Sequence, residues 1–185
     1  MKVTKQQAQA NRAHIVETAS ALFRERGYDG VGIADLMAAA GFTQGGFYKH
    51  FRSKADLMAQ AANCGLMQSA ALTAEGSASE FLKFYLSREH RDNLATGCTM
   101  AALCADAARK DDDVRATFAA GIETQLRVLR GESDTPDSAQ ARARRLATMA
   151  QALGAIVMSR ACPDDSPLAD EILQACLEDI LAPSS

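Results

Sequence analysis

The sequence predicts an all-α protein, with a three-helix helix-turn-helix head and a larger helical body. Alternating β-branched runs of the kind that form strands are nearly absent, whereas Ala-rich segments with 3.6-residue apolar spacing run almost throughout. With 185 residues, 48% hydrophobic and 23% charged, the chain can bury a core and is not expected to be disordered. We expect two domains, the head over residues 1–52 and the body over residues 53–185.

Three helices are expected in the head. The first begins at a capping box, Thr4 with Gln7, and ends at Gly27. The second is expected over residues 33–40 and is closed by a glycine, and a short third helix is expected from about residue 43 to residue 51. Two short helices joined by a Gly-Phe-Thr turn fit the geometry of a helix-turn-helix motif.

The body is predicted to consist of helices only. A second capping box, Ser53 with Asp56, opens a long helix that runs toward Ala71. The small and polar segment 73–79 is expected to be a loop. Apolar spacing and turn residues then predict five more helices, near residues 79–91, 97–110, 112–131, 138–161 and 166–182.

Charge is unevenly distributed between the two ends of the chain. Residues 1–56 carry eight Lys or Arg and five Asp or Glu, a net charge of +3, although the whole chain carries −3. A basic head on an acidic body indicates that the head meets a polyanion, and a chance asymmetry is the alternative. No apolar stretch is long enough to span a bilayer and no signal segment is visible, so we expect a cytoplasmic protein without a membrane partner.

Cysteine and histidine usage argues against two further classes of protein. Five cysteines without a CxxC pair indicate free thiols in a reducing compartment, which excludes a disulfide scaffold. The three histidines are scattered and have no metal-ligand spacing. We therefore expect no metal and no cofactor.

The third helix of the head is predicted to have one aromatic and one polar face. Phe47 and Phe51 stand four residues apart and would both point into the core of the head. Gln44 and Tyr48, also four apart, would then point outward with Lys49 alongside. A glutamine in the first turn can read an adenine edge in the major groove. The alternative is a surface helix with a half-buried tyrosine.

Glycine, threonine and lysine positions around this helix support the same interpretation. Gly45 and Gly46 each cost roughly 1 kcal/mol in a helix, which is explained if the backbone approaches another surface closely. Thr43 can cap the helix or reach a phosphate. Lys54 is expected at the first position of the next helix, where the helix dipole disfavours a cation unless an anion is near.

The stretch GYDGVGIADLMAAAGFTQGGFYKHFRSKADL, residues 27–57, resembles the DNA-binding signature of the TetR family of bacterial transcriptional regulators. The resemblance implies a homodimeric repressor, with a DNA-binding head on a helical ligand-binding body. By this resemblance Thr43, Tyr48 and Lys54 contact phosphates, and Gln44, Gly46, Lys49 and His50 lie at or near base edges, with Gly45 between them. Gly32 departs from the family pattern, because a Thr or Ser that caps the helix and contacts phosphate usually stands there.

Two helices of the body are predicted to form the dimer interface. Their apolar stripes would pack as a four-helix arrangement with the same stripes of a second chain, and ordinary intramolecular core is the alternative. The predicted interface residues are Met149, Leu153, Ile156, Val157, Leu168, Ile172, Cys176 and Ile180.

A pocket for a small-molecule effector is expected between the helices of the body. For each candidate, plain core packing is the alternative. The candidates are the apolar and thiol residues Phe81, Phe84, Tyr85, Cys98, Met100, Leu103, Cys104, Phe118 and Ile122.

The predicted function is that of a ligand-responsive, sequence-specific DNA-binding regulator, a homodimeric repressor that a small-molecule effector releases from a palindromic operator. Its partners would be double-stranded DNA, a second copy of itself and an unknown small molecule. A thiol enzyme or redox carrier that uses Cys98 or Cys104 is the second hypothesis, although it lacks an evident histidine partner. A helical adaptor without a DNA role is the third. We expect no enzymatic activity.

Overall fold

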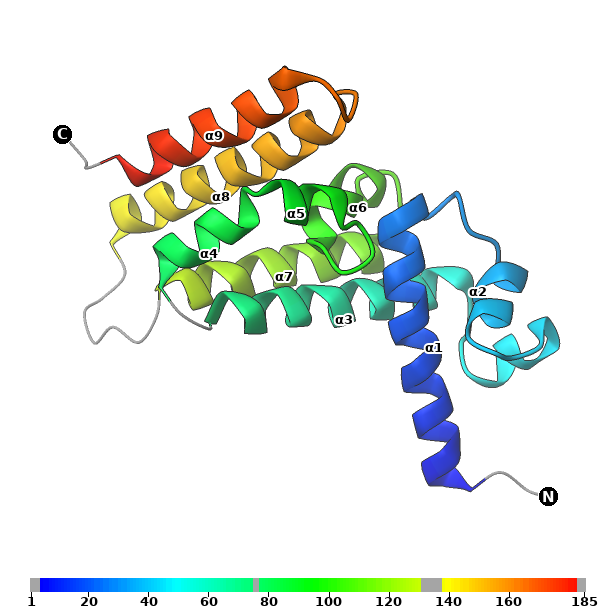
Figure 1. Ribbon diagram of the computed structural model, residues 1–185. Coiled ribbons are helices and arrows are strands. Elements are labelled where there is room, and N and C mark those ends of the chain that lie inside the picture. The colour runs from blue at the N-terminus through cyan, green and yellow to red at the C-terminus, as the bar shows by residue number, and fades with distance from the viewer. Residues whose placement is uncertain (1–3, 75–76, 131–137, 183–185) are drawn as a thin grey trace.

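The computed structural model describes residues 4–74, 77–130 and 138–182, and these residues form helices and turns without a strand. This confirms the predicted all-α class. The head lies at one end of the molecule and the α8–α9 pair at the other (Figure 1). The elements are α1 (Lys5–Arg26), α2 (Ile33–Ala39), the 3-10 helix η1 (Gln44–Lys49), α3 (Lys54–Ala74), α4 (Ala78–Tyr85), α5 (Arg88–Asp92), α6 (Thr99–Ala107), α7 (Asp112–Arg130), α8 (Ala139–Arg160) and α9 (Pro167–Leu181).

The helix ends of the head follow from the capping residues. The Thr4 hydroxyl accepts a hydrogen bond from the Gln7 backbone N–H over 3.1 Å, which confirms the predicted cap, but the Gln7 side chain donates to Asn11 Oδ1 over 2.8 Å instead of completing a capping box. At the other end of α1, the Gly27 N–H donates to the Phe23 carbonyl over 2.8 Å. The next residue, Tyr28, then folds back so that its ring meets the edge of Phe23 at a centroid distance of 5.0 Å.

The predicted single helix over 79–91 is wrong, because the chain forms two helices there. Leu86 leaves the helical conformation with ψ of 37° and ends α4. Ser87 then starts α5, and its hydroxyl accepts a hydrogen bond from the His90 backbone N–H over 3.2 Å. A serine that can act as an N-cap therefore restarts the helix in a new direction.

The third helix of the head is also different from the prediction, since it is a short 3-10 helix rather than an α-helix. Its first bond, from the Gly46 N–H to the Thr43 carbonyl, has a length of 2.9 Å and the three-residue spacing of a 3-10 turn. The glycine pair at its start explains this, because glycine favours the α-helix poorly. The Thr43 hydroxyl makes no capping hydrogen bond, contrary to the expected cap.

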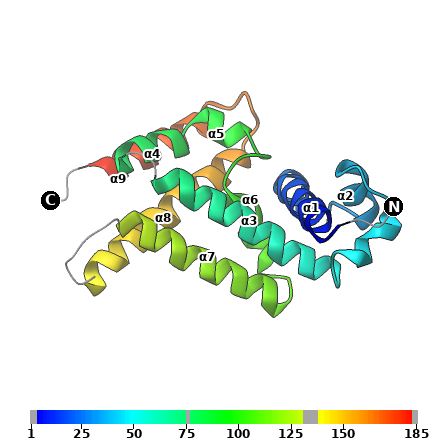
Figure 2. The same ribbon diagram turned by 90° about the horizontal axis from the view of Figure 1, so that it is seen from below.

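One hydrophobic core extends from the head into the body. It includes Ile15 and Phe47 of the head together with Leu57, Leu103 and Ile156 of the body. The long helix α3 makes this continuity possible because it packs against α1 at one end and against α7 along its length, and it lies between the two in Figure 2. The proposed boundary at residues 52/53 falls in the turn that precedes α3 and stays a prediction.

Within the described part of the chain, we find no helix with both the length and the apolar character needed to cross a membrane.

Candidate nucleic-acid interface

The aromatic residues of η1 separate into a buried and an exposed set, as their spacing predicted. The side chains of Phe47 and Phe51 are 0% and 2% exposed, and their ring centroids lie 5.4 Å apart. The side chain of Tyr48 is 74% exposed, although its ring touches the edge of Phe47 at 5.2 Å. Phe47 therefore anchors η1 in the core and holds Tyr48 outward.

Most of the other residues around η1 that were predicted to contact DNA are exposed, as Tyr48 is. Thr43, Gln44, Gly45 and Lys49 are exposed, and Gly46 and His50 are half-buried. No atom of the described residues outside its immediate chain neighbours lies within 4 Å of a Cβ placed on Gly45. The backbone at the start of η1 is therefore open to a close approach by another surface.

The turn between α2 and η1 sets the angle of this surface. Gly41 has φ of 79°, in the left-handed region that glycine adopts without strain. Its N–H donates to the Ala38 carbonyl over 3.0 Å, and the Phe42 N–H donates to the Met37 carbonyl over 2.8 Å. These two bonds end α2 and direct the chain into η1, which completes a helix-turn-helix arrangement.

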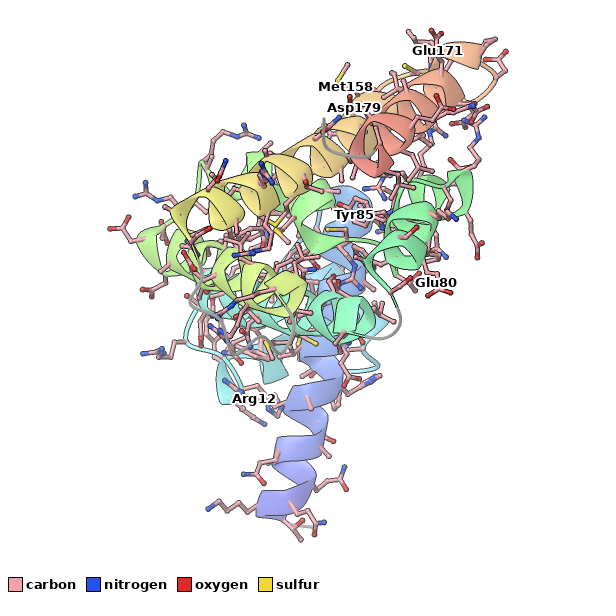
Figure 3. All side chains as sticks on the ribbon, turned by 90° about the vertical axis from the view of Figure 1, so that its left-hand side faces the viewer. Arg12, Glu80, Tyr85, Met158, Glu171 and Asp179 are labelled. Carbon is pink, nitrogen blue, oxygen red and sulfur yellow. The ribbon has the colours of Figure 1, made fainter. Side chains whose placement is uncertain are left out.

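Arg12 of α1 fastens the far end of η1, and sequence reasoning missed it. Its Nε donates to the His50 carbonyl over 3.3 Å, and its guanidinium lies 5.3 Å from the centre of the Phe51 ring. Figure 3 shows Arg12 on α1, below the body. Its spacing of three residues from buried Ile15 is the signal that could have placed it on the packed face of α1.

Lys54 lies at the first position of α3, as predicted, but its ammonium group has a partner within the protein. Nζ donates to the Tyr28 carbonyl over 2.7 Å, and burial lowers the pKa of Lys54. The carbonyl at the end of α1 therefore explains why a cation stands at this helix start. The argument that a phosphate was needed there is wrong, and a phosphate contact by Lys54 stays a prediction.

The turn before α3 adds a second cation to this surface. The Ser53 hydroxyl caps the Asp56 N–H over 3.1 Å, which confirms the predicted cap, and Asp56 Oδ2 accepts from the Arg52 N–H over 2.9 Å. The latter bond is the main reason why the pKa of Asp56 is lowered. The Arg52 side chain is 90% exposed, and its Nε lies 3.7 Å from Asp56 Oδ2, so this cation stands at the surface paired with a carboxylate.

The body contains a cavity of about 240 Å³ between α3, α4, α7 and α8. Five of the nine residues predicted for an effector pocket line it. These are Phe81, Phe84, Tyr85, Cys98 and Met100. The other four, Leu103, Cys104, Phe118 and Ile122, pack into or against the shared core instead, because they lie about one or two helical turns away along α6 and α7 from the lining residues Met100 and Gln125. Lining residues that the sequence did not indicate include Leu72, Thr73, His90, Gln125, Leu129 and Arg145.

The predicted dimer interface separates into three groups of residues. Ile156 is fully buried within the protomer, so its assignment to a dimer contact is wrong. Met149 and Leu153 line the cavity. Val157 and Leu168 are exposed, and Ile172, Cys176 and Ile180 are half-buried. Met158, which was not predicted, is 58% exposed and projects outward from α8 (Figure 3).

The thiols do not form an arrangement suited to nucleophilic catalysis. All five cysteines are free, and burial raises the pKa of Cys104 to about 11, which keeps its thiol protonated at neutral pH. His90 lies beside Cys98, but its Nε2 accepts a hydrogen bond from the Cys98 backbone N–H over 3.1 Å. Among the residues described, no three His, Cys, Asp or Glu side chains gather where they could hold a metal ion.

The helix-turn-helix region matches a known family in sequence. Residues 15–61 match the family model described as "Bacterial regulatory proteins, tetR family". The head belongs to the TetR family. It is 40% identical over 57 residues to the HTH-type transcriptional regulator AcrR of Shigella flexneri, and 49% identical over 43 residues to the HTH-type transcriptional repressor DhaR of a Mycobacterium species. These matches cover 31% and 23% of this chain, and the chain spans only about a quarter of the length of either relative, 26% and 22%.

Solved TetR-family structures resemble the chain over nearly its whole length. A TetR-family regulator from Agrobacterium tumefaciens superposes with a TM-score of 0.71 at 23% identity, covering 95% of this chain and all of that one. E. coli NemR in its reduced form gives a TM-score of 0.73 at 20% identity, covering 93% and 95%. At these identities the likeness shows the fold, which extends the TetR-family architecture from the head to the body.

Proposed function

We propose that this protein is a transcriptional regulator that binds duplex DNA through η1. The observation that carries the proposal is the outward position of Tyr48, fixed by buried Phe47 on a helix-turn-helix. Gln44 and Lys49 are exposed beside it, and their side chains offer groups for a base edge and for a phosphate. The TetR-family match of the head supports the same role.

A symmetric dimer would present two such heads to two half-sites of a palindromic operator. Exposed apolar side chains on the outer pair of helices, Val157 and Met158 of α8 and Leu168 of α9, support a dimer interface there. Burial of these side chains against a second copy would remove apolar surface from water. The two heads would then lie at a distance fixed by the body.

A small molecule in the cavity of the body would release the protein from its operator. The cavity, about 240 Å³ in volume, supports such an effector. A ligand that binds better to the conformation unable to bind DNA needs only about 1–3 kcal/mol of coupling to weaken operator binding 5- to 150-fold. One relative of the head, DhaR, is named a transcriptional repressor, and this favours repression over activation for the present protein.

Selection of bound duplexes from a random pool tests this proposal without knowledge of the operator. We expect an inverted repeat whose half-sites are centred about one or more helical turns apart. Gln44→Ala should relax the base preference at one position of each half-site and cost roughly 1–3 kcal/mol of binding. Lys83→Ala is the matched control, because Lys83 is exposed on α4 and far from η1.

Two results would contradict the proposal. One is an unchanged base preference in Gln44→Ala and in Tyr48→Ala. The other is the absence of salt-dependent binding to any duplex, because phosphate contacts release counterions and must weaken as salt rises.

A further inference from the structure

The cavity has mostly apolar walls, and its volume is large enough for a molecule of two fused rings. The aromatic side chains Phe81 and Phe84 come from α4, and aliphatic side chains such as Leu129 and Leu153 come from α7 and α8. The volume of about 240 Å³ exceeds the ~150 Å³ of an engineered apolar cavity that binds benzene. A ligand of this cavity therefore buries mainly carbon.

A buried amide oxygen in this wall has no hydrogen-bond partner among the described residues. Gln125 lines the cavity and is only 5% exposed, and no hydrogen bond reaches its Oε1 among the described residues. A buried carbonyl oxygen without a donor is rare, because leaving it unpaired loses the hydrogen bonds that water gave it.

The neighbouring threonine fixes which end of the Gln125 amide is unpaired. Gln125 Nε2 lies 2.7 Å from Thr73 Oγ1, and the Thr73 hydroxyl donates its single proton to the Ser69 carbonyl over 2.9 Å. Thr73 Oγ1 can therefore only accept from Gln125, which requires the NH₂ group on that side. The oxygen Oε1 is left as the free acceptor.

Two other polar side chains of the lining, His90 and Tyr85, are neutral. His90 Nδ1 donates to the Tyr85 carbonyl over 2.7 Å and Nε2 accepts from the Cys98 N–H, so both ring nitrogens are used. Burial lowers the pKa of His90 and raises that of Tyr85, so both are uncharged at neutral pH. Among the described residues, the lining includes no Asp or Glu to pair with a cationic ligand, and Arg145 is the one arginine.

We propose that the cavity binds a neutral, compact and mainly apolar molecule that carries one O–H or N–H donor, and that this donor pairs with Gln125 Oε1. A phenol or fused-ring alcohol has this chemistry. Only one consequence of this proposal, that ligand binding alters the affinity for DNA, rests on the proposed function. Binding itself depends on the cavity alone.

The test compares three probes with one ring system, namely naphthol, its methyl ether methoxynaphthalene, and naphthoate, all substituted at the same ring position. Affinity for the full-length protein is measured by calorimetry in the absence of DNA. Naphthol should bind about tenfold tighter than methoxynaphthalene, which lacks the donor. Tighter binding of naphthoate than of naphthol would overturn the proposal, because Arg145 rather than Gln125 would then select the ligand. Failure of all three to bind would overturn it as well.

Two variants assign the selectivity to one atom. Gln125→Met keeps the length of the side chain but removes the acceptor, so naphthol and methoxynaphthalene should bind equally. Thr73→Val frees the amide to turn its NH₂ group into the cavity, so the preference for naphthol should shrink or reverse. Thr148→Val removes a different hydroxyl from the lining and should leave the preference unchanged.

The results also separate this proposal from the proposed function. A tenfold preference that disappears in Gln125→Met supports the ligand assignment even if the protein binds no DNA. A preference that persists in both Gln125→Met and Thr73→Val overturns it even if the protein binds an inverted repeat.

Discussion

The guanidinium of Arg24 on α1 donates through Nε to the carbonyl oxygen of Ala95 over 2.7 Å. Its Nη1 donates to the hydroxyls of Ser20 and Thr99 over 2.7 and 3.3 Å. Ala95 directly precedes Thr96, which lines the cavity, and Thr99 is the first residue of α6. One buried side chain therefore connects the helix that supports the DNA-facing surface with the segment that borders the cavity.

Replacement of Arg24 by Gln should lower the free energy of unfolding by about 1–3 kcal/mol, because the Ala95 carbonyl and the Thr99 hydroxyl would lose a donor while buried or half-buried. Urea unfolding followed by circular dichroism measures this. Arg26→Gln is the control, because Arg26 lies two residues further along α1 and is exposed. Equal stability of the two variants would show that the Arg24 contacts contribute nothing.

Replacement of Gly65 by Ala should destabilise the protein by disturbing the contact between Arg24 and Thr99. A Cβ on Gly65 would lie 2.2 Å from Thr99 Oγ1 and 2.5 Å from Arg24 Nη1, so the buried network must shift. Overpacking of this kind costs about 1–3 kcal/mol, which the shift in thermal midpoint measures.

Gly154→Ala on α8 is the matched helical control. In the described part of the chain, no atom outside the neighbouring backbone of α8 lies within 4 Å of a Cβ at Gly154, so alanine should stabilise α8 by up to about 1 kcal/mol. If Gly154→Ala were instead the more damaging change, the crowding around Gly65 would not be the source of its cost, and a partner surface over α8 would be indicated.

Tyr28→Phe should leave the free energy of unfolding unchanged or raise it. The Tyr28 hydroxyl is buried without a hydrogen-bond partner among the residues that the structure describes, and this burial raises the pKa of the phenol. Removing a hydroxyl that has lost its water contacts relieves a desolvation cost and keeps the ring contact with Phe23. A loss of more than about 1 kcal/mol in chemical denaturation would mean that the hydroxyl has a partner after all.

Stability should fall when the pH drops from about 7 to 5.5, and His90 should account for part of the loss. Burial lowers the pKa of His90 in the folded protein, so the unfolded chain, with a histidine pKa of about 6.5, binds more protons in this range. Stability is therefore present above the unfolded pKa and is lost as the pH falls toward the folded one. Unfolding free energies measured across this range should have a smaller slope in His90→Gln, and an unchanged slope would argue against a lowered pKa.

Local sequence patterns predicted the head well because its structure depends on neighbours in the chain. The four-residue spacing of Phe47 and Phe51 was enough to predict which side of η1 is buried, and the caps at Thr4 and Ser53 were predicted from single side chains. The 3-10 form of η1 was not predicted. Whether a glycine pair leads to a 3-10 helix depends on which backbone groups the preceding turn leaves available for hydrogen bonds.

Contacts between distant residues could not be predicted in the same way. Lys54 was matched to an external phosphate, although the Tyr28 carbonyl, 26 residues earlier in the chain, holds it. The cavity could not be separated from the core for a similar reason. Tyr85 and Phe118 are both buried aromatic residues on helices, and only the packing of α3, α7 and α8 decides that one of them borders a space.

The continuity of α3 from the head to the far end of the body has a consequence for how the molecule melts. Because Leu57 and Leu66 on this helix belong to the same apolar cluster as Ile15 and Ile156, neither half can lose its structure without exposing surface of the other. Denaturation should then be a single cooperative transition, and a fragment that stops after residue 52 should fail to fold by itself.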